Sequence, residues 1–522
     1  VDINGNLDVD GGTIKLDGSY PTGTDNTALG DTALDSVQAG GVSNTVIGHN
    51  AGTAITTGDG NTVVGDLALD ASSTSSDNTA IGRCALTTST ASNNTAVGAY
   101  SLRDNTTGSN NVAFGISALK ENTEGDNNTS IGNSSLCNNT TADNNTALGN
   151  SAMKLNTTGA SNTAVGKDAL YANTTANNNT AIGVCAMIAT TTGANNTAVG
   201  FSALDTNTTG CENVAVGRDT LFSNTSGERN VALGYRALCA NTSGDFNIAV
   251  GRQSLFGNTT GERNSVLGLN AMYTNTTGGC NVAIGGNALY SNTTAANNTA
   301  VGACSLEANT TGCQNVAVGR SALCSNTTAA SNTAVGVCAL LTTTTSGNNT
   351  AVGFCALKTT STDSNAAFGT NALRDQTTGI YNTAVGSAAG LRTTTGTRNV
   401  AIGTSAMICN TTGSCNTAVG GMDNGTLSTM MCNTTGNQNT ALGNSTLVKN
   451  TTASNNTAVG ASALYATTTG CRNVAMGSQA GDANTTGDCN TAIGFGSLST
   501  ATTADHNTMI GAGAGNSITT GA

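Results

Sequence analysis

The chain has 522 residues, only 9% of them charged, and its 30 acidic and 18 basic residues give a formal net charge of −12. Soluble proteins carry roughly 25% charged residues, and a nucleic-acid-binding surface needs clustered Lys and Arg, so the composition argues against a nucleic-acid partner. The sequence contains no apolar stretch long enough for a transmembrane helix, which needs about 20 residues, so membrane insertion is not expected.

We treat residues 1–29 as a lead-in. After them, one short sequence motif repeats to the end of the chain. Its clearest marker is the Gly that closes "TAVG" and its variants, which occurs 29 times from Gly30 to Gly511. Of the 28 intervals between these glycines, 24 are 17 residues long. A fixed period of this size indicates an array in which each unit packs on its neighbours.

Four intervals differ from 17 residues: one is 18, two are 16 and one is 23. The 23-residue interval separates Gly420 from Gly443 and carries six extra residues. We therefore divide the repeats into a shaft over 30–420, a coil with an insertion over 421–442, and continued repeats over 443–522. Longer surface loops are tolerated entropically, so residues 421–437 are expected to bulge while the stack continues past them.

The residue slots within one unit predict β structure. Val, Ile, Leu, Phe or Met stands directly before the marker Gly, Thr or Val stands two residues earlier, and Ala usually separates them. This alternation is typical of a strand. Leu or Met four residues after the Gly suggests a second short strand beyond a tight corner, and "NTTG" suggests a turn. The fold class predicted is all-β, a parallel β-solenoid or β-roll of about 29 coils; at about 4.8 Å per coil the rod would be roughly 140 Å long.

The alternation also divides the strand into two faces. We predict a core formed by the residues before the Gly, stacked with the Leu or Met four residues after it: Val165, Ile182, Val199, Val216 and Leu233, with Leu170, Met187, Leu204 and Leu221. The opposite face carries Ala with few exceptions, and such small side chains would let three sheets approach one axis closely. We therefore predict a homotrimer held by that face, which includes Ala164, Ala181, Ala198, Ala215, Ala232, Ala249 and Ala283.

Asparagine recurs at two places in the unit. The Asn that precedes "TAVG" should stack into a ladder whose side chains hydrogen-bond from coil to coil and satisfy turn backbone; examples are Asn162, Asn179, Asn196, Asn213 and Asn230. The Asn-Thr-Thr triplets are formal N-glycosylation acceptors, and we expect them at exposed turns.

No catalytic, cofactor or metal site is predicted, and we expect that the protein is not an enzyme. Only two histidines are present, His49 and His506, and they lie in distant coils, so neither a Ser-His-Asp set nor a metal cluster can be assembled from them. Most of the 16 cysteines occupy slots of small or apolar residues, and we expect mainly free thiols.

One aromatic row is the single candidate recognition surface. The slot five residues after the Gly holds aromatic side chains in neighbouring coils, which could stack host glycans or simply stack on one another; the candidates are Phe222, Phe256, Tyr273 and Tyr290.

The motif "N-[TV]-A-[VIL]-G-x-x-[AS]-L" resembles the head repeats of YadA-like trimeric autotransporter adhesins, whose unit is somewhat shorter. It is still more similar to long "NTTG-NTAVG" repeat fibres encoded by marine bacteriophages, notably cyanophages, and by some giant viruses. The opening "VDINGNLDVDGGTIKLDG" resembles the β-rich lead-in of phage fibre proteins. The resemblance implies a left-handed parallel β-roll with three chains around one axis; the longer unit, and the lack of a recognisable anchor or chaperone domain, depart from the adhesin pattern.

These observations lead to a structural function. The expected role is a viral or phage fibre shaft, in a tail or capsid fibre, that presents a host-recognising element outside the cell, at the virion surface. Its partners would be two further copies of the same chain, a virion or cell-surface attachment point, and host surface glycans or proteins. The alternative is the head of a bacterial trimeric autotransporter-type surface adhesin. A third class, an ice-binding solenoid, is disfavoured because the Thr slots are interrupted and are expected at corners.

Overall fold

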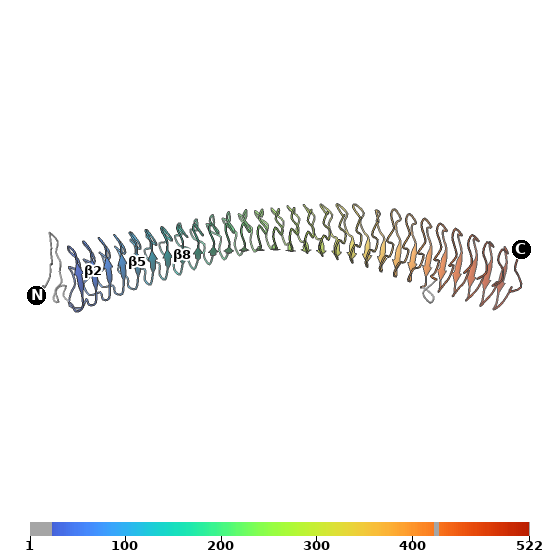
Figure 1. Ribbon diagram of the computed structural model, residues 1–522, viewed down its shortest axis with the longest axis horizontal. Helices are drawn as coiled ribbons and strands as arrows, with labels where there is room; N and C mark the ends of the chain where they lie inside the picture. Colours follow the sequence, from blue (N-terminus) through green and yellow to red (C-terminus); the bar gives the residue numbers. More distant parts are fainter. Residues whose placement is uncertain (1–22, 422–426, 521–522) are drawn as a thin grey trace, which may run out of the picture. The chain divides into compact units, whose positions relative to one another are not determined.

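The computed structural model describes residues 23–421 and 427–520. The chain divides into two compact units, Val1–Thr260 and Gly261–Ala522. Each unit is a parallel β-solenoid with one three-residue strand in every coil (Figure 1). The described residues contain no helix, and consequently none that could cross a membrane. The predicted all-β solenoid with a repeat of about 17 residues is confirmed.

The first unit contains fourteen strands among its described residues: β1 Thr27–Leu29, β2 Thr45–Ile47, β3 Thr62–Val64, β4 Thr79–Ile81, β5 Thr95–Val97, β6 Val112–Phe114, β7 Thr129–Ile131, β8 Thr146–Leu148, β9 Thr163–Val165, β10 Thr180–Ile182, β11 Thr197–Val199, β12 Val214–Val216, β13 Val231–Leu233 and β14 Ile248–Val250.

The described part of the second unit contains fifteen: β15 Ser265–Leu267, β16 Val282–Ile284, β17 Thr299–Val301, β18 Val316–Val318, β19 Thr333–Val335, β20 Thr350–Val352, β21 Ala366–Phe368, β22 Thr383–Val385, β23 Val400–Ile402, β24 Thr417–Val419, β25 Thr440–Leu442, β26 Thr457–Val459, β27 Val474–Met476, β28 Thr491–Ile493 and β29 Thr508–Ile510.

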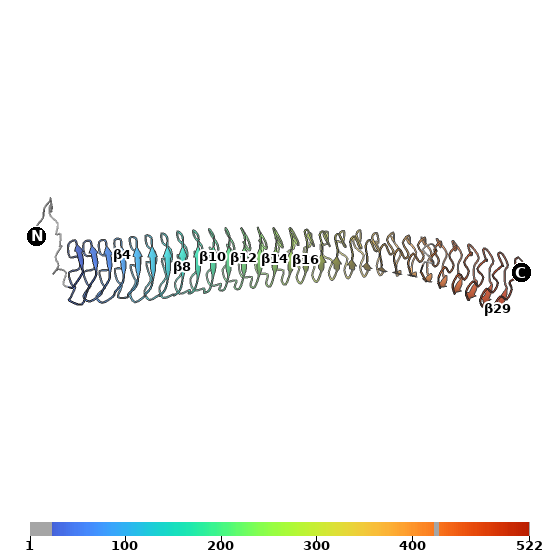
Figure 2. The same cartoon turned by 60° about the horizontal axis from the view of Figure 1, so that its bottom comes forward.

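Consecutive strands within a unit pair in parallel and in register. Between β9 and β10, for example, Ala164 lies beside Ala181 and Val165 lies beside Ile182. Figure 2 shows labelled strands such as β10 and β12 lying along the same side of their coils. Because every repeat advances the stack by one strand, each slot of the sequence becomes a row that runs along the unit.

The predicted second strand of each coil is absent from the described residues. The slots two and four residues after the marker Gly have left-handed backbone, as at Asp168 (φ 55°) and Leu170 (φ 52°). Left-handed residues cannot continue a strand, so this side of the coil is a series of turns. The marker Gly itself is required: Gly166 has φ 136°, and a Cβ there would clash with the backbone carbonyl of Gly183 in the next coil.

The predicted orientation of the strand is wrong. The middle alanines face the interior of their own coil and are fully buried in the single chain, and they include every alanine that we assigned to a trimer interface: Ala164, Ala181, Ala198, Ala215, Ala232, Ala249 and Ala283. The residue before the Gly points outward instead; Ile182 is 40% exposed and Leu233 is 46% exposed. Only the second half of the predicted core, Leu170, Met187, Leu204 and Leu221, is buried.

The narrow interior explains why alanine faces inward. Gly481 occupies the Leu slot of its coil, and a Cβ added there would lie 3.9 Å from the Cβ of Ala475 and 3.0 Å from Cδ2 of Leu464. The strand and the opposite turn are therefore separated by about one side chain. A Leu or Met on the turn side therefore leaves little room on the strand, where Ala is usual and Val63 and Val266 are larger exceptions, since interiors are close-packed.

The predicted asparagine ladder is confirmed, and a second one lies beside it. Oδ1 of Asn162 accepts a hydrogen bond from the backbone N–H of Asn179 (2.9 Å), and Nδ2 of Asn179 donates to the carbonyl of Gly193 (2.9 Å). In the second ladder, Nδ2 of Asn156 donates to Oδ1 of Asn139 (2.8 Å). Buried turn backbone thereby obtains partners without solvent.

The second ladder consists of the asparagines of the Asn-Thr-Thr triplets. Asn139 and Asn156 are fully buried, so the expectation that these acceptor sites are exposed is wrong. Their side-chain amides are engaged inside the folded coil and are not accessible for glycosylation.

The stack continues past the insertion, as predicted. The strands β24 and β25, which flank it, pair in register with Ala418 beside Ala441. The predicted bulge over 421–437 is too long: Met430 fills the Leu slot and Asn433 joins the second asparagine ladder, and both are fully buried. Residues 422–426 of the predicted bulge lie outside the described residues.

Candidate functional site

The outward face of the strands carries two rows of side chains. The third residue of each strand forms a row that we call the aliphatic row, in which every member is Val, Ile, Leu, Phe or Met. The first residue forms the threonine row, which is mostly Thr but contains Val112, Val214 and Val231 among others. No charged residue interrupts the aliphatic row in any strand of the described residues.

Members of the aliphatic row remain accessible although they are apolar. Examples are Phe114, which is 56% exposed, Leu267 at 50% and Met476 at 46%. Because consecutive strands are in register, the exposed groups adjoin one another along each unit. Contiguous exposed apolar patches larger than a few hundred Å² are rare on monomeric proteins and mark interaction surfaces.

A neighbouring slot provides a contrast. The residue directly after the marker Gly is equally exposed, with Val184 at 42%, but this slot holds Lys167 in the coil before and Arg218 two coils later. Apolar identity is thus not a general property of the outer surface. The aliphatic row, by contrast, is apolar in every strand of the described residues.

The predicted aromatic row is only partly assembled. Tyr273 and Tyr290 stack face to face, with ring centroids 5.3 Å apart and planes 5° apart. Phe222 and Phe256 occupy the same slot of the first unit, but the intervening coil places Cys239 between them. All four aromatic side chains are half-buried. In another pair of coils, a cationic side chain of this slot lies over an aromatic ring of the same slot. There, Nζ of Lys154 lies 6.0 Å from the ring centroid of Tyr171.

The stacked tyrosine pair therefore favours the structural interpretation of this row. Stacked rings contribute about 0.5–1.5 kcal/mol beyond the area they bury, which stabilises one coil against the next. A saccharide would need an aromatic face that is free, and each ring of this pair already covers a face of the other.

All 16 cysteines are free thiols. Burial raises the pKa of the Cys324 thiol to about 11, and the nearby Glu307 carboxylate adds to the effect. Sγ of Cys324 lies 3.6 Å from Oε2 of Glu307. A thiol held protonated in this way is a poor nucleophile, so Cys324 is not arranged for catalysis.

The surface ion pairs do not form a reaction centre either. Asp219 lies between Arg218 and Arg236, with its Oδ2 3.4 Å from Nε of each. The pKa of the half-buried Asp205 carboxyl is raised overall, because the effect of desolvation exceeds that of its hydrogen bond with Ser202, which lowers the pKa.

Among residues 23–421 and 427–520, no cluster of three or more His, Cys, Asp or Glu side chains could hold a metal ion.

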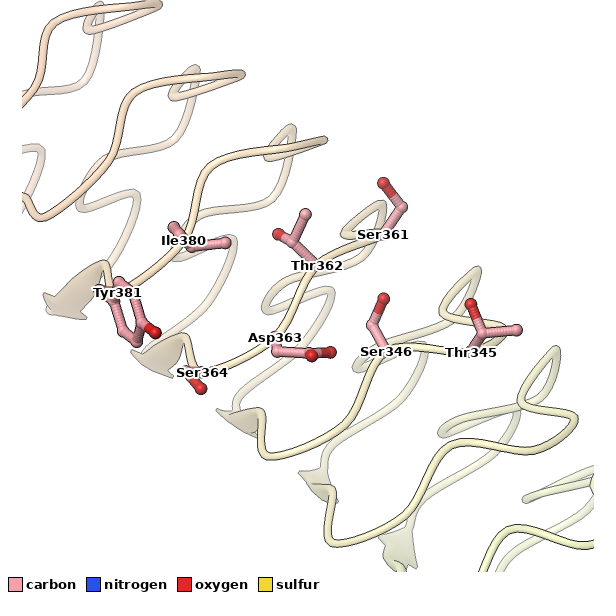
Figure 3. A pocket seen from close by; sticks show the side chains of 8 residues that line it. All are labelled: Thr345, Ser346, Ser361, Thr362, Asp363, Ser364, Ile380 and Tyr381. Atoms are coloured by element: carbon pink, nitrogen blue, oxygen red, sulfur yellow. The ribbon is translucent and has the colours of Figure 1, made fainter.

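A cavity that the sequence analysis missed lies where one coil is a residue short. Its volume is about 380 Å³. Figure 3 shows its lining side chains on three successive coils: Thr345, Ser346, Ser361, Thr362, Asp363, Ser364, Ile380 and Tyr381. The signal was present in the sequence, because the interval from Gly353 to Gly369 is one of the two 16-residue intervals.

No protein-family model matches the chain, and no curated protein matches it at a significant level.

Proposed function

We propose that the chain is the shaft of an extracellular structural fibre in which three copies associate through the aliphatic row. A viral or phage tail or capsid fibre is the preferred setting, with the head of a bacterial surface adhesin as the alternative. The observation that carries the proposal is the uninterrupted, exposed aliphatic row. This replaces the alanine face, which is buried inside each chain, as the surface of association.

The period of the row supports a second copy of the chain as the partner. A partner that covers the row in every coil must present an apolar group about every 4.8 Å along the stack. Another copy of the same stack has this spacing by construction, and like rows can pack in register. The resemblance to trimeric β-roll repeats favours three copies rather than two. One narrow row per chain also suits contact around a common axis.

The stacked architecture supports a role as a spacer. Each coil is bonded to the next through backbone pairs, two asparagine ladders and hydroxyl groups such as Oγ1 of Thr157, which donates to the carbonyl of Thr174 (2.9 Å). Such a stack gains length in proportion to its number of coils. Fourteen strands at about 4.8 Å give the first unit a length of roughly 65 Å.

An ice-binding function is less well supported. The threonine row of the strand face could present an ordered array of hydroxyl groups. It is broken by Val112, Val214 and Val231, however, and the adjoining aliphatic row contains Phe114 and Phe368. A flat crystal surface requires a level face, whereas rows of unequal bulk suit interdigitation with protein side chains.

Two matched substitutions test the proposed association. Ile182→Lys places a charge in the aliphatic row, and Val184→Lys places the same charge two residues away in a slot where Lys167 occurs naturally. The two parent side chains are about equally exposed, at 40% and 42%. Ile182→Lys should weaken assembly as measured by sedimentation, because it buries unpaired charge, while Val184→Lys should not. Equal assembly of both variants would contradict the proposal.

The shaft role is tested by solution scattering or electron microscopy of the full chain. We expect an elongated particle of roughly 140 Å, the length given by the number of coils. A compact particle would contradict a spacer function even if the copies associate.

A further inference from the structure

The cavity in the second unit lies at a coil that is one residue short. The corner between Thr360 and Asn365 has four residues instead of the usual five, as the 16-residue interval requires. The short corner is flanked by standard corners at 345–346 and 380–381, and Figure 3 shows the side chains of all three around the depression. The cavity volume of about 380 Å³ falls within the range of about 300–1,000 Å³ of small-ligand sites.

The polar groups of the cavity are held in place by the backbone. Oδ1 of Asp363 accepts a hydrogen bond from the N–H of Gly347 (2.7 Å). The hydroxyl of Thr362 donates to the carbonyl of Gly379 (2.6 Å), and that of Ser361 donates to the carbonyl of Thr377 (2.9 Å). Since these hydroxyl protons are committed to the protein, the hydroxyl oxygens and the second carboxylate oxygen are left to accept hydrogen bonds.

An aromatic ring completes the site. Tyr381 is 56% exposed, unlike the half-buried tyrosines of the stacked pair, and it adjoins Ile380 at the edge of the cavity. Its ring offers an apolar face and its hydroxyl a polar tip. The lining contains no cation, and Asp363 would repel an anion. The site therefore suits an uncharged or cationic ligand that has several hydrogen-bond donors and one apolar face, and an uncharged polyol such as a sugar ring meets this description.

We infer that this cavity binds a single neutral pyranose unit of a glycan. The carboxylate and hydroxyl oxygens would accept hydrogen bonds from vicinal sugar hydroxyls, and the C–H face of the ring would pack on Tyr381. The site would place a contact for host glycans on the side of the shaft. It is complete within one chain, so it does not rest on trimer assembly.

The other short coil provides a natural control. Between Gly82 and Gly98 the corner is shortened in the same way, and the N–H of Ser76 donates to Oγ of Ser92 (3.0 Å). Ser92 thus replaces the carboxylate of Asp363, and Asn110 occupies the slot of Tyr381. The fold accommodates Ser and Asn at these positions. The double variant Asp363→Ser/Tyr381→Asn therefore removes the recognition groups and leaves a corner whose residues occur naturally in the other short coil.

Saturation-transfer NMR on the full chain tests the inference, with the methyl glycosides of glucose, galactose and mannose at millimolar concentration as probes. We expect transfer to at least one glycoside, with an affinity at least about tenfold lower in the double variant, while circular dichroism stays unchanged. The inference is overturned if none of the three glycosides receives saturation, or if the double variant binds as well as the parent. A response to sialyllactose alone would also overturn it, since that ligand is anionic.

A reciprocal variant keeps the test independent of lost folding. Ser92→Asp/Asn110→Tyr builds the proposed recognition groups into the other short corner of the first unit. When introduced into the Asp363→Ser/Tyr381→Asn background, these changes should restore transfer to the same glycoside. If the restored protein is folded but gives no saturation transfer to the glycoside, the carboxylate and the tyrosine are not the groups that bind the sugar.

Discussion

Met509 faces Gly515 across the interior of the last coil: a Cβ added to Gly515 would lie 2.8 Å from Cγ of Met509. In the other coils these two slots usually hold Ala and Leu or Met, as with Ala181 and Met187. The larger side chain has changed sides, and the opposite residue has lost its own. In this coil the two slots therefore share one interior space, which a bulky side chain can fill from either side.

This shared space predicts the behaviour of a substituted interior. Ala181→Leu should overpack the coil and lower the free energy of unfolding by about 1–3 kcal/mol. Adding Met187→Gly should recover part of this loss by reproducing the arrangement of Met509 and Gly515. Denaturant unfolding of the two single variants and the double variant gives the coupling energy; a coupling of zero would mean that the two slots do not share one space.

A second prediction concerns which strand face is inside. Met187→Asp should unfold the neighbouring coils, because it leaves an unpaired charge in a fully buried position. Ile182→Asp should leave the chain folded, because this side chain is 40% exposed. Hydrogen exchange of the amides of β10 and β11 separates the two cases. Greater exchange in Ile182→Asp than in Met187→Asp would reverse the assignment of the faces.

The asparagine ladder leads to a third prediction. Asn179→Ser shortens a side chain that bonds the N–H of Asn196 (2.9 Å) and the carbonyl of Gly193 (2.9 Å). A buried group left unpaired costs about 1–3 kcal/mol, so the melting temperature should fall by several degrees. Asn178→Ser is the control, since its slot is exposed and Ser161 occupies it in the coil before with the same left-handed backbone. Equal melting temperatures for the two variants would argue against the ladder.

The sequence predicted the period, the strand, its register and one asparagine ladder, because each depends on repetition at a fixed spacing. The prediction of which strand face lies inside the coil was wrong. Alternation at i and i+2 identifies two faces of a strand but not their direction, and the usual assumption that the larger apolar residue is buried was wrong for Val165 and Ile182. The left-handed turn at Leu170, which returns the chain across the coil, has no signature in residue type.

The candidate recognition site was missed for a related reason. Phe222, Phe256, Tyr273 and Tyr290 share one slot and were prominent as a pattern. Tyr381 is isolated in the sequence, and only the structure shows that it lies beside a cavity at a coil that is one residue short.

A fourth prediction concerns thiol chemistry. The pKa of the Cys324 thiol is raised to about 11, so at pH 8 iodoacetamide should modify it more slowly than the exposed Cys280 and Cys415. Glu307→Gln removes the carboxylate that helps to raise this pKa and should accelerate the reaction at Cys324. Peptide mass mapping measures each rate; an unchanged rate in Glu307→Gln would show that the carboxylate has no influence.

The same thiol makes stability depend on pH. Because its pKa is higher in the folded than in the unfolded chain, its contribution is fully present below the ordinary thiol value of 9.0 and is lost as the pH rises to about 11. Parent protein should therefore lose stability over this window, and Cys324→Ser should lose less. An identical pH profile for both proteins would contradict the assignment.

The measurement that tests the proposed fibre most directly is the native mass of the full chain by sedimentation equilibrium over a range of concentrations. The aliphatic row predicts a species of three times the 51.2 kDa chain mass, stable on dilution because contacts recur in every coil. A folded species of 51.2 kDa at all concentrations would mean that the exposed aliphatic row is not an interface between copies of the chain.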